Sequence, residues 1–517
     1  MASAEVGHRA ARTFGAAPQG TARLLRVNLR RNSMPWILLL IAALFWFDSY
    51  RPSIATSPLY GMRTFWNLGQ GHTIIDFGPF VAGVAAWMGS REGRRGLGDL
   101  VTTTARPRWA AQLATWAATT IWAVAAYLVF VCVMFAAYAR QGVGGSPPWW
   151  WVAVGATAVA AFSAAGFALG AYWPSRFAAA VAAFGGFVAM ALSSRTGFSH
   201  TSGWALILPT NSNGSFDGSV QADSGIFYPW LPDLPIVRIM FLAGIAVAAL
   251  GLTGLPARAG GPWLRRAAVA VTLAGVALAG TGIELATTAK VAANGIVIPA
   301  LHDAANDAPL AYRPVCGHAA GVPLCLNPAY ARWMPNLTTA LAPVLLEVRG
   351  LAGAPVRATQ VPASYPSGNG GPPQVITLGG QPPVLRLSLG LVNLPGPCGF
   401  CSGPVVSKAF ANQVRLMFAH AFAGAGSGRG TQAQQAVQAA MLRVAGLPFA
   451  AQPRLIANTE DFLASGPRPQ PAPSSANGPV YAAAARLAGL SAAARHAWLA
   501  SHLAALRAGR LALKDLP

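Results

Sequence analysis

The stretch SREGRRGLGDLVTTTARPRW, residues 90–109, decides how we expect this chain to fold, because it joins two apolar runs that are each long enough to cross a bilayer. It contains five arginines, a glycine-rich centre and few bulky apolar side chains. A transmembrane helix needs about 20 predominantly apolar residues to cross the hydrocarbon core. We therefore expect the stretch to lie outside the membrane, on the side that its positive charge indicates.

The composition of the whole chain is typical of a polytopic membrane protein. Its 517 residues are 54% hydrophobic and only 10% charged, whereas soluble domains carry about 25% charged residues. The net charge of +22 comes almost wholly from arginine, since there are only three lysines. Strong positive charge is also typical of proteins that bind nucleic acid. Here the arginines follow the expected membrane topology, so we expect no nucleic-acid partner.

Seven segments are predicted to be transmembrane helices. They are residues 34–48, 72–90, 109–139, 149–172, 177–196, 236–255 and 267–289. The first is short for a hydrocarbon core of about 30 Å, so we expect this helix to extend into the residues that flank it. Tryptophans such as the run at 149–151 stand near the predicted helix ends, where their amphipathic rings suit the headgroup level.

The distribution of arginine predicts the orientation. If the N-terminus is cytoplasmic, the cytoplasmic segments hold 15 arginines and the outer connections with their flanking ends hold five. The positive-inside rule therefore favours a cytoplasmic N-terminus in a bacterial-type cell membrane. An odd number of spans then places residues 290–517 outside.

Residues 290–517 are predicted to form a small α+β domain outside the membrane. Alternating apolar residues predict strands within 374–379 and 384–392. Helical periodicity appears in 407–424 and 431–447, and the alanine-rich stretch 480–517 predicts one or two further helices.

Four of the five cysteines lie in this tail: Cys316, Cys325, Cys398 and Cys401. An even set in a domain that faces an oxidising compartment favours structural disulfides. The pairing is open, and the local pairs 316–325 and 398–401 are the simplest. A zinc site and a redox-active C-x-x-C are the alternatives, but we expect no metal here.

Several enzyme motifs are missing from the sequence. None of the three lysines follows a glycine, so there is no G-x-x-x-x-G-K-[ST] phosphate-binding loop. The H-E-x-x-H zinc motif and a G-x-S-x-G nucleophile elbow are also missing. We therefore predict no catalytic residues and no cofactor bound by this chain itself.

Asp48, Asp76 and Glu284 are the ionisable candidates in the predicted spans. We expect Asp48 and Glu284 to lie nearer an interface, which leaves Asp76, in HTIIDFGPFVAG (72–83), as the candidate for a functional role. An ionisable side chain at membrane depth suggests a role in a substrate pathway or gate. The alternative is a local hydrogen bond near the outer surface, next to Gly78 and Pro79.

An amphipathic helix is predicted just before the first span. Arg23, Arg26 and Arg30 fall on one face, and Leu25 and Leu29 fall on another. Such a helix lies in the membrane interface with its arginines toward anionic headgroups. The alternative is an ordinary positive flank that only sets the topology.

These features together resemble the membrane subunits of type-2 ABC exporters over about residues 20–255. The resemblance consists of an interfacial helix, six spans, a first cytoplasmic loop bearing glutamate and arginine, and a larger outer loop between the fifth and sixth spans. It implies that the first cytoplasmic loop docks on a separately encoded ATPase, which binds the ATP and Mg²⁺. The docking residues would be Glu92, Arg94, Arg95, Gly96, Leu97, Asp99 and Leu100.

The resemblance implies an α-helical polytopic membrane protein, a six-span exporter core plus a seventh span, with a small α+β extracytoplasmic domain. Its parts would be a cytoplasmic N-terminus with the interfacial helix (1–33), the permease core (34–255), a cytoplasmic link with the seventh span (256–289) and the outer domain (290–517). Some relatives carry a peptidase-like outer domain, whose zinc motif this tail lacks. We expect a homodimer or heterodimer of permeases that exports an amphiphilic substrate. The alternatives are a membrane-anchored sensor or adaptor and a membrane-bound enzyme.

The orientation is tested by a reporter fused after Pro517. A reporter enzyme that works only outside the cytoplasm should be active there, because the arginine distribution keeps the N-terminus inside. A cytoplasm-specific reporter at the same position should be inactive, and activity of that reporter would contradict the predicted topology.

Overall fold

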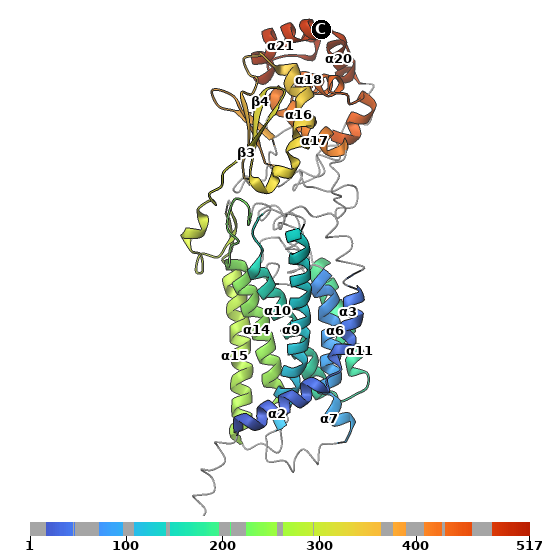
Figure 1. The fold of residues 1–517 in the computed structure, drawn as a ribbon, viewed down its shortest axis with the longest axis vertical. Helices are drawn as coiled ribbons and strands as arrows, with labels where there is room; N and C mark the ends of the chain where they lie inside the picture. The colour runs from blue at the N-terminus through green and yellow to red at the C-terminus, as the bar shows by residue number, and fades with distance from the viewer. Residues whose placement is uncertain are drawn as a thin grey trace, which may run out of the picture.

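The computed structural model describes residues 17–44, 46, 72–96, 108–140, 145–195, 207, 224–255, 262–292, 294–362, 376–388, 408–425, 430–456 and 478–517. It consists of a helical bundle with a mixed α/β domain stacked on one end (Figure 1). The bundle is built from α3 (Met34–Leu44), α6 (His72–Gly89), α9 (Arg108–Arg140), α10 (Trp149–Tyr172), α11 (Ala178–Arg195), α14 (Asp233–Thr253) and α15 (Pro262–Thr287).

Four of the described helices, α9, α10, α14 and α15, are long and apolar enough to cross a membrane. The apolar stretches Met34–Leu44, Phe77–Gly89 and Ala178–Met190 are shorter. The outward faces of long and short helices alike carry large apolar side chains, as lipid contact requires: Phe184 of α11 is 70% exposed and Leu273 of α15 is 62% exposed. The chain is thus a helical membrane protein with a small sheet-containing domain, and seven spans stay a prediction.

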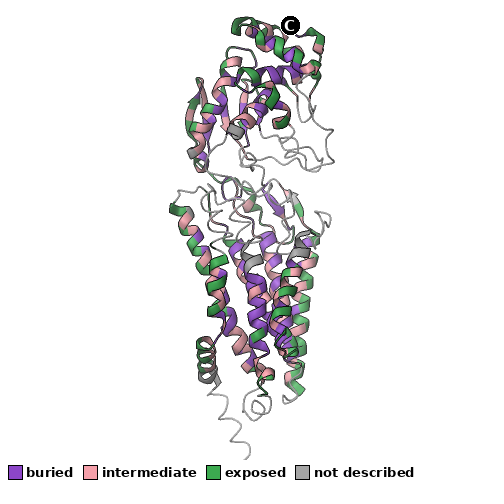
Figure 2. Ribbon diagram, turned by 90° about the vertical axis from the view of Figure 1, so that its right-hand side faces the viewer, coloured by how far each residue is buried: buried purple, intermediate pink, exposed green. Residues whose placement is uncertain are grey.

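Helix α10 packs with its backbone against α6. A Cβ added at Gly166 would overlap the carbonyl oxygen of Ala82, and one added at Gly170 would overlap that of Ala86. Small residues at such positions let two membrane helices approach closely. Buried residues accordingly gather between the helices, whereas exposed residues lie on the outer faces (Figure 2).

The same kind of contact joins α14 to α15. Gly244 faces the backbone of Gly275, and Gly251 faces Thr272. A buried hydrogen bond of 2.7 Å between the hydroxyls of Thr120 and Ser163 adds a polar link between α9 and α10. Glycine contacts and an interhelical hydrogen bond therefore act with apolar side-chain packing to hold these helices together.

The tail domain contains a five-stranded sheet in the order β3-β4-β5-β7-β6. The strands are β3 (Val315–Ala319), β4 (Val322–Leu326), β5 (Arg357–Gln360), β6 (Ile376–Gly379) and β7 (Val384–Leu387). β3 pairs antiparallel with β4, and β6 pairs antiparallel with β7. β5 runs parallel to both β4 and β7. The sheet is therefore mixed, with its two antiparallel pairs at the two edges.

Helices complete the core of the tail domain. They are α16 (Met334–Val348), α17 (Lys408–Ala423), α18 (Gln432–Val444), α20 (Pro479–Gly489) and α21 (Ala492–Arg507). Their apolar faces and the sheet form one cluster that includes Leu341, Leu385 and Phe418, all fully buried. The strands predicted within 374–379 and 384–392 and the helices predicted within 407–424, 431–447 and 480–517 are confirmed.

The contact between α6 and α10 is tested by comparing two glycine substitutions. Gly170→Ala should destabilise the bundle by about 1–3 kcal/mol, the usual cost of overpacking, because the added methyl group overlaps the Ala86 backbone. Gly185→Ala is the matched control, since a Cβ there meets nothing within 4 Å. Thermal unfolding in detergent, followed by tryptophan fluorescence, should separate the two variants, and equal melting temperatures would contradict the packing.

Candidate functional site

Helix α2 (Ala17–Arg30) lies across the end of the bundle away from the tail domain (Figure 1). Arg23, Arg26 and Arg30 are exposed, whereas Leu25 and Leu29 are half-buried. The indole nitrogen of Trp122 on α9 donates to the carbonyl oxygen of Leu29 at 3.0 Å. The predicted amphipathic helix therefore exists, and it is fastened to the bundle at its C-terminal end.

The turn after α2 is fixed by Asn32, a buried side chain. Its amide nitrogen donates to the Thr119 hydroxyl at 2.9 Å, and its amide oxygen accepts from the backbone N–H of Met34 at 2.9 Å. The second bond caps the first turn of α3, whose backbone N–H groups have no intrahelical partner. Asn32 thus joins α2, α3 and α9 at one point.

The first loop of the sequence begins with the short helix α7 (Arg91–Arg94), which follows α6 directly. Arg94 folds back onto α6. It donates to the Ser90 hydroxyl at 3.0 Å and to the Trp87 carbonyl oxygen at 3.1 Å, and its guanidinium carbon lies 3.4 Å from the centre of the Trp87 ring. This combination of hydrogen bonds and cation–π contact holds Arg94 against the end of α6.

Glu92 spans the loop in the other direction, with its carboxylate 3.2 Å from Nε of Arg108 at the start of α9. A Cβ at Gly93 would overlap Pro174, which follows α10. Of the predicted docking residues, Glu92 and Arg94 therefore brace the chain itself, and Arg95 and Gly96 are exposed. Leu97, Asp99 and Leu100 lie outside the described residues.

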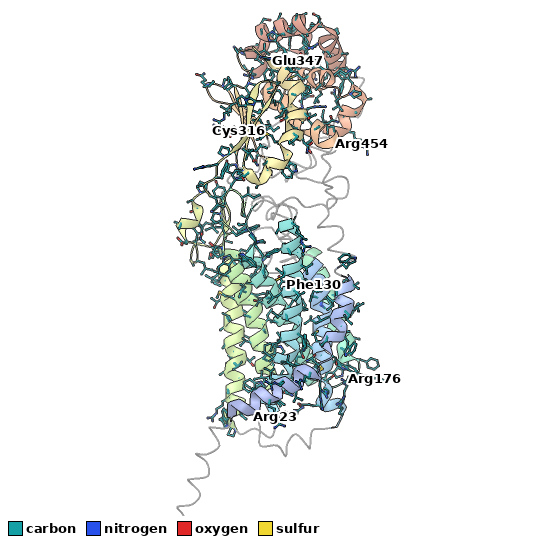
Figure 3. The ribbon with its side chains drawn as sticks, viewed as in Figure 1. Arg23, Phe130, Arg176, Cys316, Glu347 and Arg454 are labelled. Atoms are coloured by element: carbon teal, nitrogen blue, oxygen red, sulfur yellow. A yellow bond between two sulfur atoms is a disulfide. The ribbon has the colours of Figure 1, made fainter. Side chains whose placement is uncertain are left out.

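Positive charge is concentrated at this end of the bundle. Partial burial and the nearby charges of Arg95 and Arg31 lower the pKa of Arg91. Burial and then Arg95 lower the pKa of Arg94. Arg31 follows α2, so like charges from two distant segments meet here. Figure 3 shows Arg23 and Arg176 at the same end. We call this surface, formed by Arg31, Arg91, Arg94 and Arg95, the arginine base.

Two further hydrogen bonds join α9 and α10 to α14 at this end of the bundle. Trp109, at the start of α9, donates from its indole nitrogen to the carbonyl oxygen of Leu250 at 3.0 Å. The Tyr172 hydroxyl, at the end of α10, donates to that of Leu252 at 2.6 Å. The ends of α9, α10 and α14 are thereby joined next to α7.

Asp76 lies in α6, which continues as a helix through Pro79. Its side chain lies outside the described part of the structure, so its role as a pathway residue stays a prediction.

At the opposite end of the bundle, four polar residues join α14 to the tail. Asp233 is the first residue of α14 and is fully buried. One of its oxygens accepts from the backbone N–H of Ile298 at 2.9 Å and lies 3.2 Å from Nδ1 of His302. The other ring nitrogen of His302 is 3.1 Å from Asp307, which also accepts from Asn294 at 2.8 Å.

The segment before α14 also enters the tail domain. Ile226 and Phe227 belong to its hydrophobic core. The carbonyl oxygen of Phe227 accepts from the backbone N–H of Leu310 at 2.7 Å. On the bundle side, Trp230 donates to the carbonyl oxygen of Ser146 at 2.8 Å. We call this region, with Asp233, Asn294, His302 and Asp307, the outer junction.

Sequence reasoning did not identify the outer junction. Asp233 is one of several aspartates in the predicted loop between the fifth and sixth spans, and His302 matches no motif. The single local signal is the stretch HDAAND (302–307), in which a histidine is followed by two aspartates. Its partner Asp233 is 69 residues away, so only the fold brings them together.

Cys316 and Cys325 form a disulfide, as predicted for the local pair. They stand directly opposite each other in the antiparallel pair β3–β4. Cys398 and Cys401 lie outside the described residues. Among the described residues, no group of three or more histidine, cysteine, aspartate or glutamate side chains is arranged to hold a metal ion.

The disulfide is tested by alkylating the full chain before and after reduction. Cys316 and Cys325 should react only after reduction. Replacing both by serine should destabilise the tail domain by about 2–3 kcal/mol, because a closed loop of this size restricts the unfolded chain. Cys132→Ser, in α9, is the control and should leave the tail unchanged. Labelling of both thiols before reduction would rule out the bond.

Comparison with known proteins identifies no relative: no protein-family model, no curated protein and no solved structure matches this chain. Its function is therefore inferred from the arrangement of the residues themselves, together with the architectural resemblance to type-2 ABC exporters.

Proposed function

We propose that the chain is the permease subunit of an ATP-binding-cassette exporter and that the arginine base is where a separately encoded ATPase docks. The observation that carries the proposal is the bracing of this base. Arg94 is packed on α6, Glu92 is paired with Arg108 of α9, and Gly93 is pressed against Pro174 after α10. A push against α7 would therefore reach three bundle helices at once.

Close packing supports transmission of such a push through the bundle. Gly166 and Gly170 hold α10 against the backbone of α6, so these two helices move together rather than sliding past intervening side chains. The Tyr172–Leu252 bond connects α10 to α14 at the same end. Helix α14 then leads to Asp233 and the outer junction. Movement at the base would in this way alter the packing beneath the tail domain.

The proposed topology places the arginine base in the cytoplasm and the tail domain outside. It is supported by the arginine distribution and by the position of α2 and α7 at the end of the bundle away from the tail. The disulfide is compatible with an oxidising compartment. The core would contain six spans, with α15 as the seventh. ATP and Mg²⁺ would be bound by the partner ATPase.

The working unit would be a homodimer or heterodimer of permeases in the cell membrane, and its substrate would be amphiphilic. Exposed apolar faces on α11 and α15 are available for lipid or for a second permease. A second candidate function, a membrane-anchored sensor or adaptor, is favoured by one observation. The segment with Ile226 and Phe227 is built into the core of the tail domain and leads directly into α14, so a ligand on the tail would act on the bundle.

ATPase docking is tested by charge reversal in the arginine base. Arg95→Glu should reduce co-purification of the ATPase encoded with this chain by at least about tenfold, which corresponds to about 1.4 kcal/mol. Arg95 is chosen because it is exposed, whereas Arg94 also supports α6.

Arg265→Glu, at the start of α15, is the matched control, because it makes the same charge reversal in another segment predicted to be cytoplasmic. It should leave co-purification unchanged. Equal recovery of the ATPase with wild type and with Arg95→Glu would contradict docking at this surface.

A further inference from the structure

A buried carboxylate at the start of a membrane helix needs compensation, because removing its charge from water is costly. The Asp233 side chain is 0% exposed. Its Oδ2 atom contacts Ile298 and His302, and its Oδ1 atom has no hydrogen-bond partner among the described residues. Both contacts come from the segment that connects α15 to the tail domain. The charge of Asp233 is therefore balanced from outside its own helix.

His302 lies between two carboxylates. Its Nδ1 atom is 3.2 Å from Asp233, and its Nε2 atom is 3.1 Å from Asp307. A neutral imidazole carries one N–H and can donate to only one of them, whereas an imidazolium donates to both. An ionised carboxylate can accept a hydrogen bond but cannot donate one, so the ring must supply both protons, and the geometry suits the protonated ring. The two bonds would then be charge-assisted and stronger than neutral ones.

The surrounding charges agree with this geometry. Hydrogen bonding to Asp307 is the main cause that raises the pKa of His302, and the charge of Asp233 also raises it. The bonds from His302 and Asn294 lower the pKa of Asp307.

Three other charged residues lie on the segments that pack around His302. Asp303 accepts from the backbone N–H of Ala305. Arg238 of α14 lies over the Trp151 ring at 5.0 Å. Lys290 is the first residue of β1 (Lys290–Ala292).

We propose that His302 is a proton-binding site that clamps the segment leading into the tail domain onto α14: the protonated ring bridges Asp233 and Asp307, and loss of the Nδ1 proton releases Asp233. The proton would come from the solvent on the outer side, because the Asp307 side chain is 53% exposed and the His302 side chain 14%. The inference does not depend on the identity of the transported substrate or on the ATPase.

The clamp also secures apolar packing. Ile296 lies in β2 (Gly295–Val297), and Ile298 follows that strand. Both are buried in one cluster with Leu234 and Val237 of α14. The backbone N–H of Ile298 is held by the same Asp233 oxygen that contacts His302. Release of the imidazole from Asp233 would therefore weaken the hydrogen bond from the Ile298 N–H and the apolar packing beside it. This contact lies where the chain leaves the bundle for the tail domain.

The sign of the pH effect follows from the two pKa shifts. A group whose pKa is raised in the folded state stabilises that state at low pH and loses the effect as pH rises through the raised pKa. For His302 this loss occurs above its ordinary value of 6.5. For Asp307, whose pKa is lowered, the stabilisation is lost below its ordinary value of 3.8. The clamp should be closed between these limits and open in alkaline solution.

Hydrogen exchange of the full chain in lipid nanodiscs tests the clamp. The peptide that contains Ile298 should open about tenfold more readily at pH 8.5 than at pH 5.5, after correction for intrinsic exchange, because a charge-assisted hydrogen bond is lost. His302→Gln should remove this pH dependence. His318→Gln, on exposed β3, is the matched control and should keep it.

Asp307→Asn separates a proton-binding role from a merely structural one. It retains the partner Asp233 but removes the main cause of the raised His302 pKa, so the midpoint of the pH-dependent opening should move to lower pH. A midpoint identical to that of wild type would overturn the proposal. So would exchange at Ile298 that is independent of pH in the wild type, or pH dependence that survives in His302→Gln.

Discussion

Close backbone contact around α10 is the constraint on which the rest of the structure depends. In an apolar solvent, helices gain little from burying apolar side chains, so association relies on close packing and on hydrogen bonds between helices. Gly166 and Gly170 provide the close packing toward α6, and Ser163 provides a hydrogen bond toward α9. Because α10 also packs against α14 and α11, a change in its position would be felt by each of these helices.

The two ends of this bundle differ in how their charged side chains are arranged. At the arginine base like charges gather, and in the described part of the loop Glu92 is the one carboxylate, paired with Arg108, so that exposed positive charge is available to anionic lipid. At the outer junction the charged groups contact one another instead, because the ring of His302 lies between Asp307 and the buried Asp233. The exposed positive charge of the arginine base is typical of an interaction surface. The paired groups of the outer junction instead connect two segments of the same chain.

Prediction from sequence succeeded where the signal is local. The apolar runs and the helical periodicity of 431–447 depend only on residues a few positions apart. It failed for β3 and β4, because β3 is an edge strand with mostly exposed residues and β4 contains Pro323. Helix α16 escaped notice for a related reason, since Pro335 and Pro343 interrupt a pattern that tertiary packing nevertheless folds into a helix.

The sequence by itself determined that the chain is a helical membrane protein, that its positive charge gathers beside the first helices, and that cysteines collect in the tail. These properties follow from composition and from the order of residues along the chain. Only the tertiary structure decided that Cys316 lies opposite Cys325, that Glu92 reaches Arg108, and that His302 stands between Asp233 and Asp307. Each of these contacts depends on a distance in space that strand pairing or helix packing sets, and no spacing in the sequence encodes that distance.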